Sequence, residues 1–225
     1  MRLVNPHSLA ATLDAINEAF FFGRSLSPTQ RERAARWIAQ RRGKPGAYAD
    51  MFAPVEDYRA EPLTLFTGES RASRAGAAHI LGEESCRALI LLDVRLAEVQ
   101  DALARATAGM MTRLCPETLT SGIYCCAMCS VALWRHLAVG GLADSGRYLR
   151  AGLKTLRSRW DGERGWRGFP LHYTLLALTE MDLPPAVAEM RHAAPLCERY
   201  LRRTPTSGTY VLRRRRLAEK VLARV

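Results

Sequence analysis

Residues Gly165–Leu178 read GWRGFPLHYTLLAL, a glycine-rich turn that leads into an almost wholly apolar segment. Glycine and proline interrupt regular structure and permit a turn. The following segment, residues 170–181, is apolar nearly all round, which is typical of a helix that is buried on every side. This stretch therefore predicts a loop followed by a buried helix.

The same turn recurs along the chain at a constant interval of about forty-three residues. Its glycines are Gly122, Gly165 and Gly208. A second landmark, an Ala-Leu pair, recurs at nearly the same interval and begins at Ala88, Ala132 and Ala177. Self-similarity with a period of this size is the signature of a repeat architecture.

Amphipathic segments separate the turns. Apolar residues step by three and four along residues 96–110, 149–160 and 187–201, which is the pattern of a helix packed on one face. Residues 125–139, in contrast, are apolar nearly all round. Each repeat thus pairs a buried inner helix with an amphipathic outer helix, and because no stretch alternates with period two, we expect no sheet.

These patterns predict an all-α fold of tandem helical hairpins, arranged as a partial or compact α/α toroid or as a curved solenoid. We expect one α/α repeat domain over residues 1–225, with an N-terminal helix in 1–26, divergent repeats in 27–114 and the clearest repeats in 115–225. The sequence Ser27-Pro28-Thr29-Gln30 predicts a helix start with a capping box. Gly165 is expected to adopt positive φ or to allow a close approach of the backbone, because glycine does either at little cost.

Residues Gly165–Leu178 resemble the repeat of prenyltransferase β-subunits and of squalene or terpenoid cyclases, in which a Gly-Trp turn and a proline lead into an Ala-Leu helix. Residues Tyr124–Leu133 look like the same element one repeat earlier. The resemblance covers residues 115–222 well and residues 30–92 loosely. It implies alternating inner and outer helices around an apolar cavity that holds an apolar or isoprenoid-like ligand.

The chain departs from these families in its acidic residues. Terpenoid cyclases of the proton-initiated class use an Asp-x-Asp-Asp cluster, which this sequence lacks. Prenyltransferase β-subunits hold zinc with an aspartate, a cysteine and a histidine, and here cysteines begin the corresponding helix without a neighbouring aspartate. The resemblance therefore concerns the fold, and the sequence does not decide whether the protein is an enzyme.

Three of the six cysteines, Cys125, Cys126 and Cys129, lie at the predicted start of an inner helix. His172 begins the next inner helix, and neighbouring repeats place equivalent positions side by side. Cys126, Cys129 and His172 are therefore candidate ligands of zinc, which thiolates and imidazole bind. Since adjacent residues diverge on a helix, Cys125 can join them only from the preceding loop. Packing of the thiols as small apolar residues is the competing interpretation.

A thiol redox function is the main alternative, with Cys126 and Cys129 as a Cys-x-x-Cys pair at a helix N-terminus. Helical peroxidase-partner and carboxymuconolactone decarboxylase proteins carry such a pair with a histidine one turn later. That position is Leu133 here, and His136 lies further on. A non-catalytic helical scaffold for a protein or an acidic partner is a further alternative.

Aromatic residues cluster at the predicted turns and inner-helix starts. In the toroids that the sequence resembles, such residues line the cavity and face isoprenoid chains or carbocations. The candidates for ligand binding are accordingly Tyr48, Tyr124, Trp166, Phe169 and Tyr173. Aromatic side chains also hold loops against a core, so both roles stay open.

Two further groups carry charge at helical spacing. His79 with Glu83 and Glu84 suits a metal or acid–base site, although a solvated helix face is the favoured interpretation. The run Arg213–Arg216 spreads around a helix, because successive residues turn by about 100°. No nucleic-acid motif accompanies it, so we do not expect a nucleic-acid partner.

Composition sets the remaining expectations. The formal net charge is +11, and nearly all of the basic residues are arginines. Either an acidic partner or a bias in amino-acid composition would explain this excess of arginine. No apolar run reaches the roughly 18 residues of a membrane span, and the N-terminus lacks a signal-peptide pattern. We expect a soluble, cytoplasmic protein whose partner is an apolar small molecule or another protein.

Overall fold

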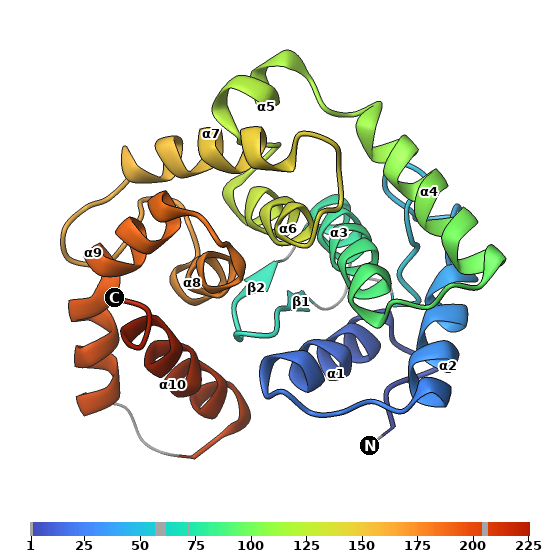
Figure 1. Ribbon diagram of the computed structural model, residues 1–225, viewed down its shortest axis with the longest axis horizontal. Helices are drawn as coiled ribbons and strands as arrows, with labels where there is room; N and C mark the ends of the chain where they lie inside the picture. The colour runs from blue at the N-terminus through green and yellow to red at the C-terminus, as the bar shows by residue number, and fades with distance from the viewer. Residues whose placement is uncertain (1, 57–61, 72, 204–206) are drawn as a thin grey trace. The chain divides into compact units, whose positions relative to one another are not determined.

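The computed structural model describes residues 2–56, 62–71, 73–203 and 207–225, and these residues are mainly helical (Figure 1). The predicted all-α class is confirmed. The chain divides into two compact units. The first unit comprises Met1–Leu65, Ser70–Cys115 and Val139–Ala143, and the second unit comprises Phe66–Glu69, Pro116–Ala138 and Asp144–Val225.

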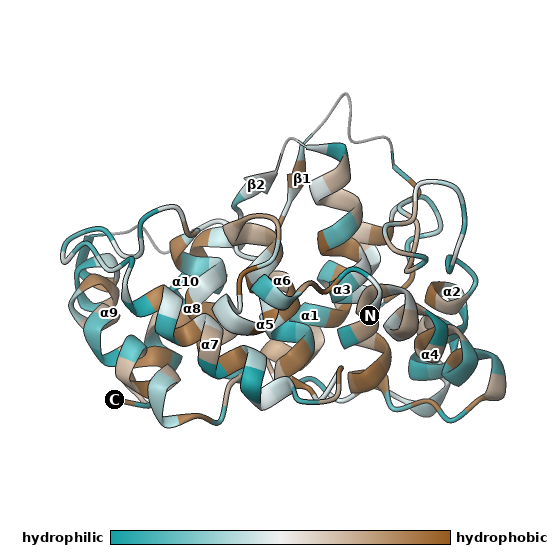
Figure 2. Cartoon of the chain, turned by 90° about the horizontal axis from the view of Figure 1, so that it is seen from above, coloured by the Kyte–Doolittle hydropathy of each residue, from teal (hydrophilic) through white to brown (hydrophobic). Residues whose placement is uncertain are grey.

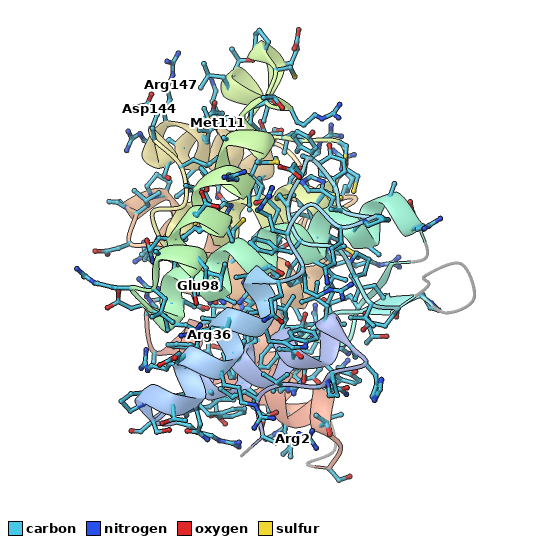
Figure 3. All side chains as sticks on the ribbon, turned by 90° about the vertical axis from the view of Figure 1, so that its right-hand side faces the viewer. Arg2, Arg36, Glu98, Met111, Asp144 and Arg147 are labelled. Atoms are coloured by element: carbon cyan, nitrogen blue, oxygen red, sulfur yellow. The ribbon has the colours of Figure 1, made fainter. Side chains whose placement is uncertain are left out.

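The first unit contains four helices and one short strand pair within the described residues. Its helices are α1 (Leu9–Phe21), α2 (Pro28–Ala39), α3 (Arg74–Leu92) and α4 (Ala97–Met111). Helix α3 packs against α1, α2 and α4, and α2 also packs against α4. An ion pair between Arg36 on α2 and Glu98 on α4 joins these two helices (Figure 3). The strands β1 (Leu63–Thr64) and β2 (Ser70–Arg71) pair in antiparallel register, a minor exception to the expectation of no sheet.

The predicted start of α2 is confirmed in detail. The Ser27 hydroxyl accepts the backbone N–H of Gln30 at 3.2 Å, and the Gln30 side chain accepts the backbone N–H of Ser27 at 2.9 Å. This reciprocal capping satisfies two backbone donors that a helix start leaves without partners.

The second unit contains six helices within the described residues. They are α5 (Pro116–Ser121), α6 (Ala127–Ala138), α7 (Ser145–Arg157), α8 (Leu171–Glu180), α9 (Pro184–Arg203) and α10 (Thr209–Leu222). Helix α8 packs against both α6 and α10, while α7 packs against both α5 and α9. Contacts of α6 with α7, and of α9 with α8 and α10, join these two series.

The two series differ in burial as the sequence predicts. Residues 129–137 of α6 and 173–178 of α8 are buried without a break. Along α7 and α9, in contrast, buried and exposed residues alternate with the turn of the helix. The hydropathy colouring of Figure 2 shows this mixture of polar and apolar residues on α9. In this unit, the helices that are apolar nearly all round are thus buried, and the amphipathic helices expose their polar faces.

The three turn glycines all occupy positions that favour glycine. Gly122, Gly165 and Gly208 have φ values of 66°, 119° and 98°, and they precede α6, α8 and α10, respectively. The predicted positive φ of Gly165 is confirmed. Residues with a side chain avoid this region because Cβ meets the following carbonyl oxygen.

Gly122 also allows two segments to meet backbone to backbone. A Cβ atom at Gly122 would overlap the backbone of Gly152 in α7. A Cβ atom at Gly152 would in turn lie 2.6 Å from Nε1 of Trp134 on α6. The Trp134 indole N–H donates to the Gly122 carbonyl oxygen at 2.7 Å. These three residues thus connect the turn, α6 and α7 at van der Waals contact.

Arginine side chains bind the carbonyl oxygens that end several helices. Arg31 donates to the carbonyls of Leu91 and Leu92 at the end of α3. Arg224 donates to Thr179 and Met181 around the end of α8, and Arg215 donates to Leu201 near the end of α9. A cation at a helix C-terminus is favourable, because the last carbonyls lack partners in the helix and carry partial negative charge.

Within the described residues, no helix combines the length and the apolar character that crossing a bilayer requires.

We predict that Gly122→Ala lowers the free energy of unfolding by roughly 2–5 kcal/mol, because it adds backbone strain and forces α7 away from the turn. Gly162→Ala is the matched control, since Gly162 has φ of 86° and an added Cβ meets no atom within 4 Å. Strain alone should cost the control roughly 1–2 kcal/mol. Urea denaturation measures both variants, and equal losses would show that the close approach to α7 contributes nothing.

Candidate functional site

A pocket of about 380 Å³ lies among α8, α9 and α10 of the second unit. A volume of this size is at the lower end of the range for small-molecule sites. Its apolar lining comes from all three helices and consists of Leu171, Leu175, Leu196, Cys197 and Ala218. The pocket thus presents a surface suited to a hydrocarbon chain.

Basic side chains surround this apolar lining. They are Arg164, Arg199, Arg203 and Arg214, and Glu163 is the one acidic residue among the residues that line the pocket. Arg199 donates to the carbonyl oxygen of Glu163 at 2.8 Å, and Arg214 donates through Nε to the carbonyl oxygen of Thr67 at 2.6 Å. These bonds hold two guanidinium groups at the pocket, where further N–H donors can meet an anion, since each guanidinium carries five.

His172 lines the same pocket at the first turn of α8. Its ring meets Tyr200 edge to face, with 5.2 Å between ring centroids, and its Nδ1 lies 3.7 Å from Oε1 of Glu69. The same Glu69 oxygen accepts the backbone N–H groups of His172 and Tyr173, each at 3.0 Å. Glu69 therefore caps α8, whose preceding residue, Pro170, makes no side-chain cap.

The Glu69 carboxyl is held in its ionised form. Burial raises its pKa, but the neighbouring His172 imidazole and the backbone N–H of Tyr173 lower it more, so that the pKa lies below the ordinary value of 4.5. A carboxylate at this position can orient the imidazole ring. The pocket thus combines an imidazole, an apolar surface and positive charge.

Cys197 is the sole thiol among the residues that line the pocket. Its side chain is buried, and burial together with the charge of Glu198 raises its pKa to about 11. The thiol is therefore protonated near neutral pH, and it serves as part of the apolar lining rather than as a nucleophile.

The structure brings Cys126 and Cys129 together at the start of α6 but leaves His172 apart from them. Cys126 directly precedes α6, and its sulfur accepts the backbone N–H of Cys129 at 3.5 Å. Within the described part of the chain, Cys126, Cys129 and His172 do not bring their ligand atoms within 4.8 Å of one another. The three predicted zinc ligands are therefore not assembled as a set.

The five aromatic residues predicted to bind ligand do not line the pocket among α8, α9 and α10. Trp166 donates from Nε1 to Glu189 at 2.8 Å, Phe169 stacks on Trp134, and Tyr173 is buried beside Arg135. Each of these side chains fastens a turn or a helix start to the core.

The other two aromatic candidates also have structural contacts. Tyr124 is half-buried in the turn before α6, and its backbone N–H donates to the Ser130 hydroxyl at 2.9 Å. Tyr48, in the first unit, stacks on His79 with 4.4 Å between ring centroids. Tyr48 thus packs on His79, and the backbone of Tyr124 helps to fix the turn before α6.

The expectation of a solvated face at His79, Glu83 and Glu84 is wrong, because all three side chains are buried within the first unit. Nε2 of His79 lies 3.2 Å from Oε1 of Glu83, and Glu84 accepts a hydrogen bond from Asn17 at 3.3 Å. Asn17 accepts in turn from Arg87 at 2.8 Å. Removing charged groups from water is costly, so buried charged side chains are usually found in hydrogen-bonded pairs such as these.

Sequence reasoning did not identify most of the pocket. Arg199 and Arg203 lie on α9, where the sequence pattern draws attention to the apolar stripe that packs against the core and not to the charged residues beside it. Arg164 lies in a turn. Glu69 is 103 residues from His172, so local spacing carries no signal of their contact. Arg214 belongs to the arginine run, whose members point in different directions as predicted: Arg213 is buried against Phe66, whereas Arg216 pairs with Glu219 at the surface.

Comparisons of the chain with protein-family models, with curated proteins and with solved structures find no match.

We predict that Glu69→Gln lowers the free energy of unfolding by about 1 kcal/mol at pH 7, because the cap loses its charge but keeps an acceptor. Since the folded-state pKa of Glu69 is lowered, its contribution is fully present above pH 4.5 and is lost as the pH falls through the folded-state value. The difference between wild type and variant should therefore shrink below pH 4.5. Chemical denaturation across this pH range measures it.

Glu163→Gln is the control, because Glu163 is an exposed side chain whose loss should change stability by less than about 0.5 kcal/mol. A stability difference for Glu69→Gln that is independent of pH would contradict the role of the charge.

Proposed function

We propose that this protein binds an elongated ligand with an apolar chain and an anionic head group in the pocket among α8, α9 and α10. The observation that carries the proposal is the pairing of an apolar lining with four arginines at one pocket. Guanidinium groups favour phosphates and carboxylates because their paired N–H donors match two oxygens at once. Leucine side chains favour a hydrocarbon chain because its burial removes apolar surface from water.

This proposal keeps the isoprenoid-like ligand class that the resemblance to prenyltransferase β-subunits and cyclases implies. The shared position of Gly122, Gly165 and Gly208 before α6, α8 and α10 supports the repeat interpretation on which that resemblance rests. The recognition elements differ from the expected ones, because leucines and arginines line this pocket where aromatic residues were expected. A prenyl phosphate fits both the apolar lining and the basic residues.

His172 gives the pocket a group that can transfer a proton to or from a bound ligand. Its Nδ1 lies 3.7 Å from Oε1 of the ionised Glu69, which can orient the ring toward a bound ligand. Activity in addition to binding would therefore be acid–base chemistry on the head group or next to it. The binding function does not depend on this step.

We predict that farnesyl diphosphate binds more tightly than either of its parts, because only the complete ligand satisfies both surfaces of the pocket. Isothermal titration calorimetry should give an affinity at least tenfold higher for farnesyl diphosphate than for farnesol or inorganic diphosphate. Palmitate tests whether a carboxylate on a fatty chain serves equally well. Absence of binding by every amphipathic anion, with an intact fold, would favour the scaffold alternative.

Arg203→Glu should weaken farnesyl diphosphate binding about tenfold or more while leaving farnesol binding unchanged, because it reverses one charge at the head-group end. Arg191→Glu is the matched control, since Arg191 is exposed on the same helix and is not among the residues that line the pocket. Equal losses in both variants would assign the effect to net charge alone.

A further inference from the structure

Three cysteines, Cys125, Cys126 and Cys129, lie where the chain enters α6. Cys125 is exposed, Cys126 is half-buried and Cys129 is fully buried. Cys125 lies in the loop before the helix, the one position from which the sequence allowed it to approach the other two. The sulfur atoms of Cys125 and Cys129 lie within 4.8 Å of each other. The cluster therefore extends from solvent to the buried side of the helix.

The three thiols are in different electrostatic surroundings. Hydrogen bonding with the side chains of Cys125 and Cys126, together with burial, raises the pKa of Cys129 far above its ordinary range. The Cys126 sulfur receives the backbone N–H of Cys129, in the first turn of α6. Helix N-termini stabilise negative charge through such N–H groups. Cys129 therefore keeps its proton, while the Cys126 sulfur lies at the helix start beside a backbone N–H.

The local backbone fixes Cys126 at the helix start. Its carbonyl oxygen accepts the backbone N–H of Ser130 at 2.9 Å and the Ser130 hydroxyl at 2.7 Å. The same hydroxyl accepts the backbone N–H of Tyr124 at 2.9 Å. Helix geometry places the Cα atoms of residues three apart about 5 Å from each other, which is within the Cα separation that a disulfide requires.

We propose that Cys126 and Cys129 form a thiol–disulfide exchange site that reduces a disulfide in a small molecule or a protein. Cys126 is the attacking thiol because it is accessible and its sulfur receives a backbone N–H. Cys129 is the resolving thiol, because it is buried and lies one helical turn from Cys126, whose sulfur contacts the Cys129 backbone N–H at 3.5 Å. Cys125 is exposed in the preceding loop and takes no part in the bond that forms.

The exchange has two steps. In the first, the Cys126 thiolate attacks one sulfur of the substrate disulfide, a bond forms between them, and the other substrate sulfur leaves as a thiolate and takes a proton. In the second, Cys129 gives up its proton and attacks the Cys126 sulfur, so that the Cys126–Cys129 bond forms and the remaining substrate sulfur leaves. The substrate gains two electrons and two protons, and the site is oxidised to a disulfide.

Equilibration of the full-length protein in buffers of oxidised and reduced glutathione tests the proposal. After the exchange is stopped with acid, free thiols are alkylated with iodoacetamide in denaturant, so that buried thiols also react. The protein is then reduced, and the newly released thiols are labelled with N-ethylmaleimide. Tandem mass spectrometry then assigns the label to each cysteine. We expect the second label on Cys126 and Cys129 at oxidising ratios, its loss at reducing ratios, and iodoacetamide on Cys115 and Cys125 throughout. The buried thiols of Cys86 and Cys197 should carry the second label at no ratio.

Variants separate the two roles. Cys129→Ser should accumulate a mixed disulfide between Cys126 and glutathione, since the resolving thiol is absent, whereas Cys126→Ser should form neither species. Cys125→Ser is the control and should form the Cys126–Cys129 disulfide as wild type does. Circular dichroism checks that each variant is folded, and the assignment in wild type stands independently of the variants.

Three results would overturn the proposal. One is a disulfide that includes Cys125, and another is full retention of free thiols in oxidised glutathione. The third is a stoichiometric metal ion in freshly purified protein that protects the three thiols from alkylation, which would assign the cluster to metal binding. Elemental analysis of the same sample measures that ion.

Discussion

The close approach at Gly122 constrains the arrangement of α6 and α7 in the second unit. Gly122 and Gly152 let the turn and α7 meet without side chains between them, and Trp134 binds the turn carbonyl from α6. Dense packing of this kind leaves little space for adjustment, because a close-packed interior responds even to one added methylene. The position of this turn also determines where Cys125 and Cys126 lie just before α6. The geometry of the thiol cluster therefore depends on the contact between Gly122 and α7, in which no cysteine takes part.

The cap of α8 connects packing to the pocket in a similar way. Proline precedes the helix and offers no side chain to cap it, so Glu69 supplies the acceptor from a distant loop. The same carboxylate lies beside His172, which lines the pocket. One ionised group thus stabilises the start of a helix and sets the surroundings of a titratable ring. A change at Glu69 would therefore affect both the start of α8 and the surroundings of the His172 ring.

The features that sequence analysis predicted correctly are those that local chemistry determines. The capping box of Ser27 and Gln30, and the positive φ of Gly165, depend only on residues close in sequence. The surroundings of His79 were predicted wrongly, because helical spacing describes a face but not what covers it. The pocket arginines and Glu69 went unrecognised for the related reason that their meeting is a consequence of tertiary packing. The cysteine cluster was predicted in part. The Cys-x-x-Cys spacing indicated a site of metal or redox chemistry, but only the structure shows that Cys125 lies in the loop before α6.

The arginines at the helix ends change how the basic character of the chain is understood. Several guanidinium groups donate to carbonyl oxygens at the ends of α3, α8 and α9. A lysine cannot replace them equivalently, because its ammonium lacks the planar arrangement of donors that spans two carbonyls. Arg31, Arg215 and Arg224 thus serve to terminate helices as well as to add positive charge. Replacing them would therefore destabilise the last turns of those helices in addition to lowering the charge of the chain.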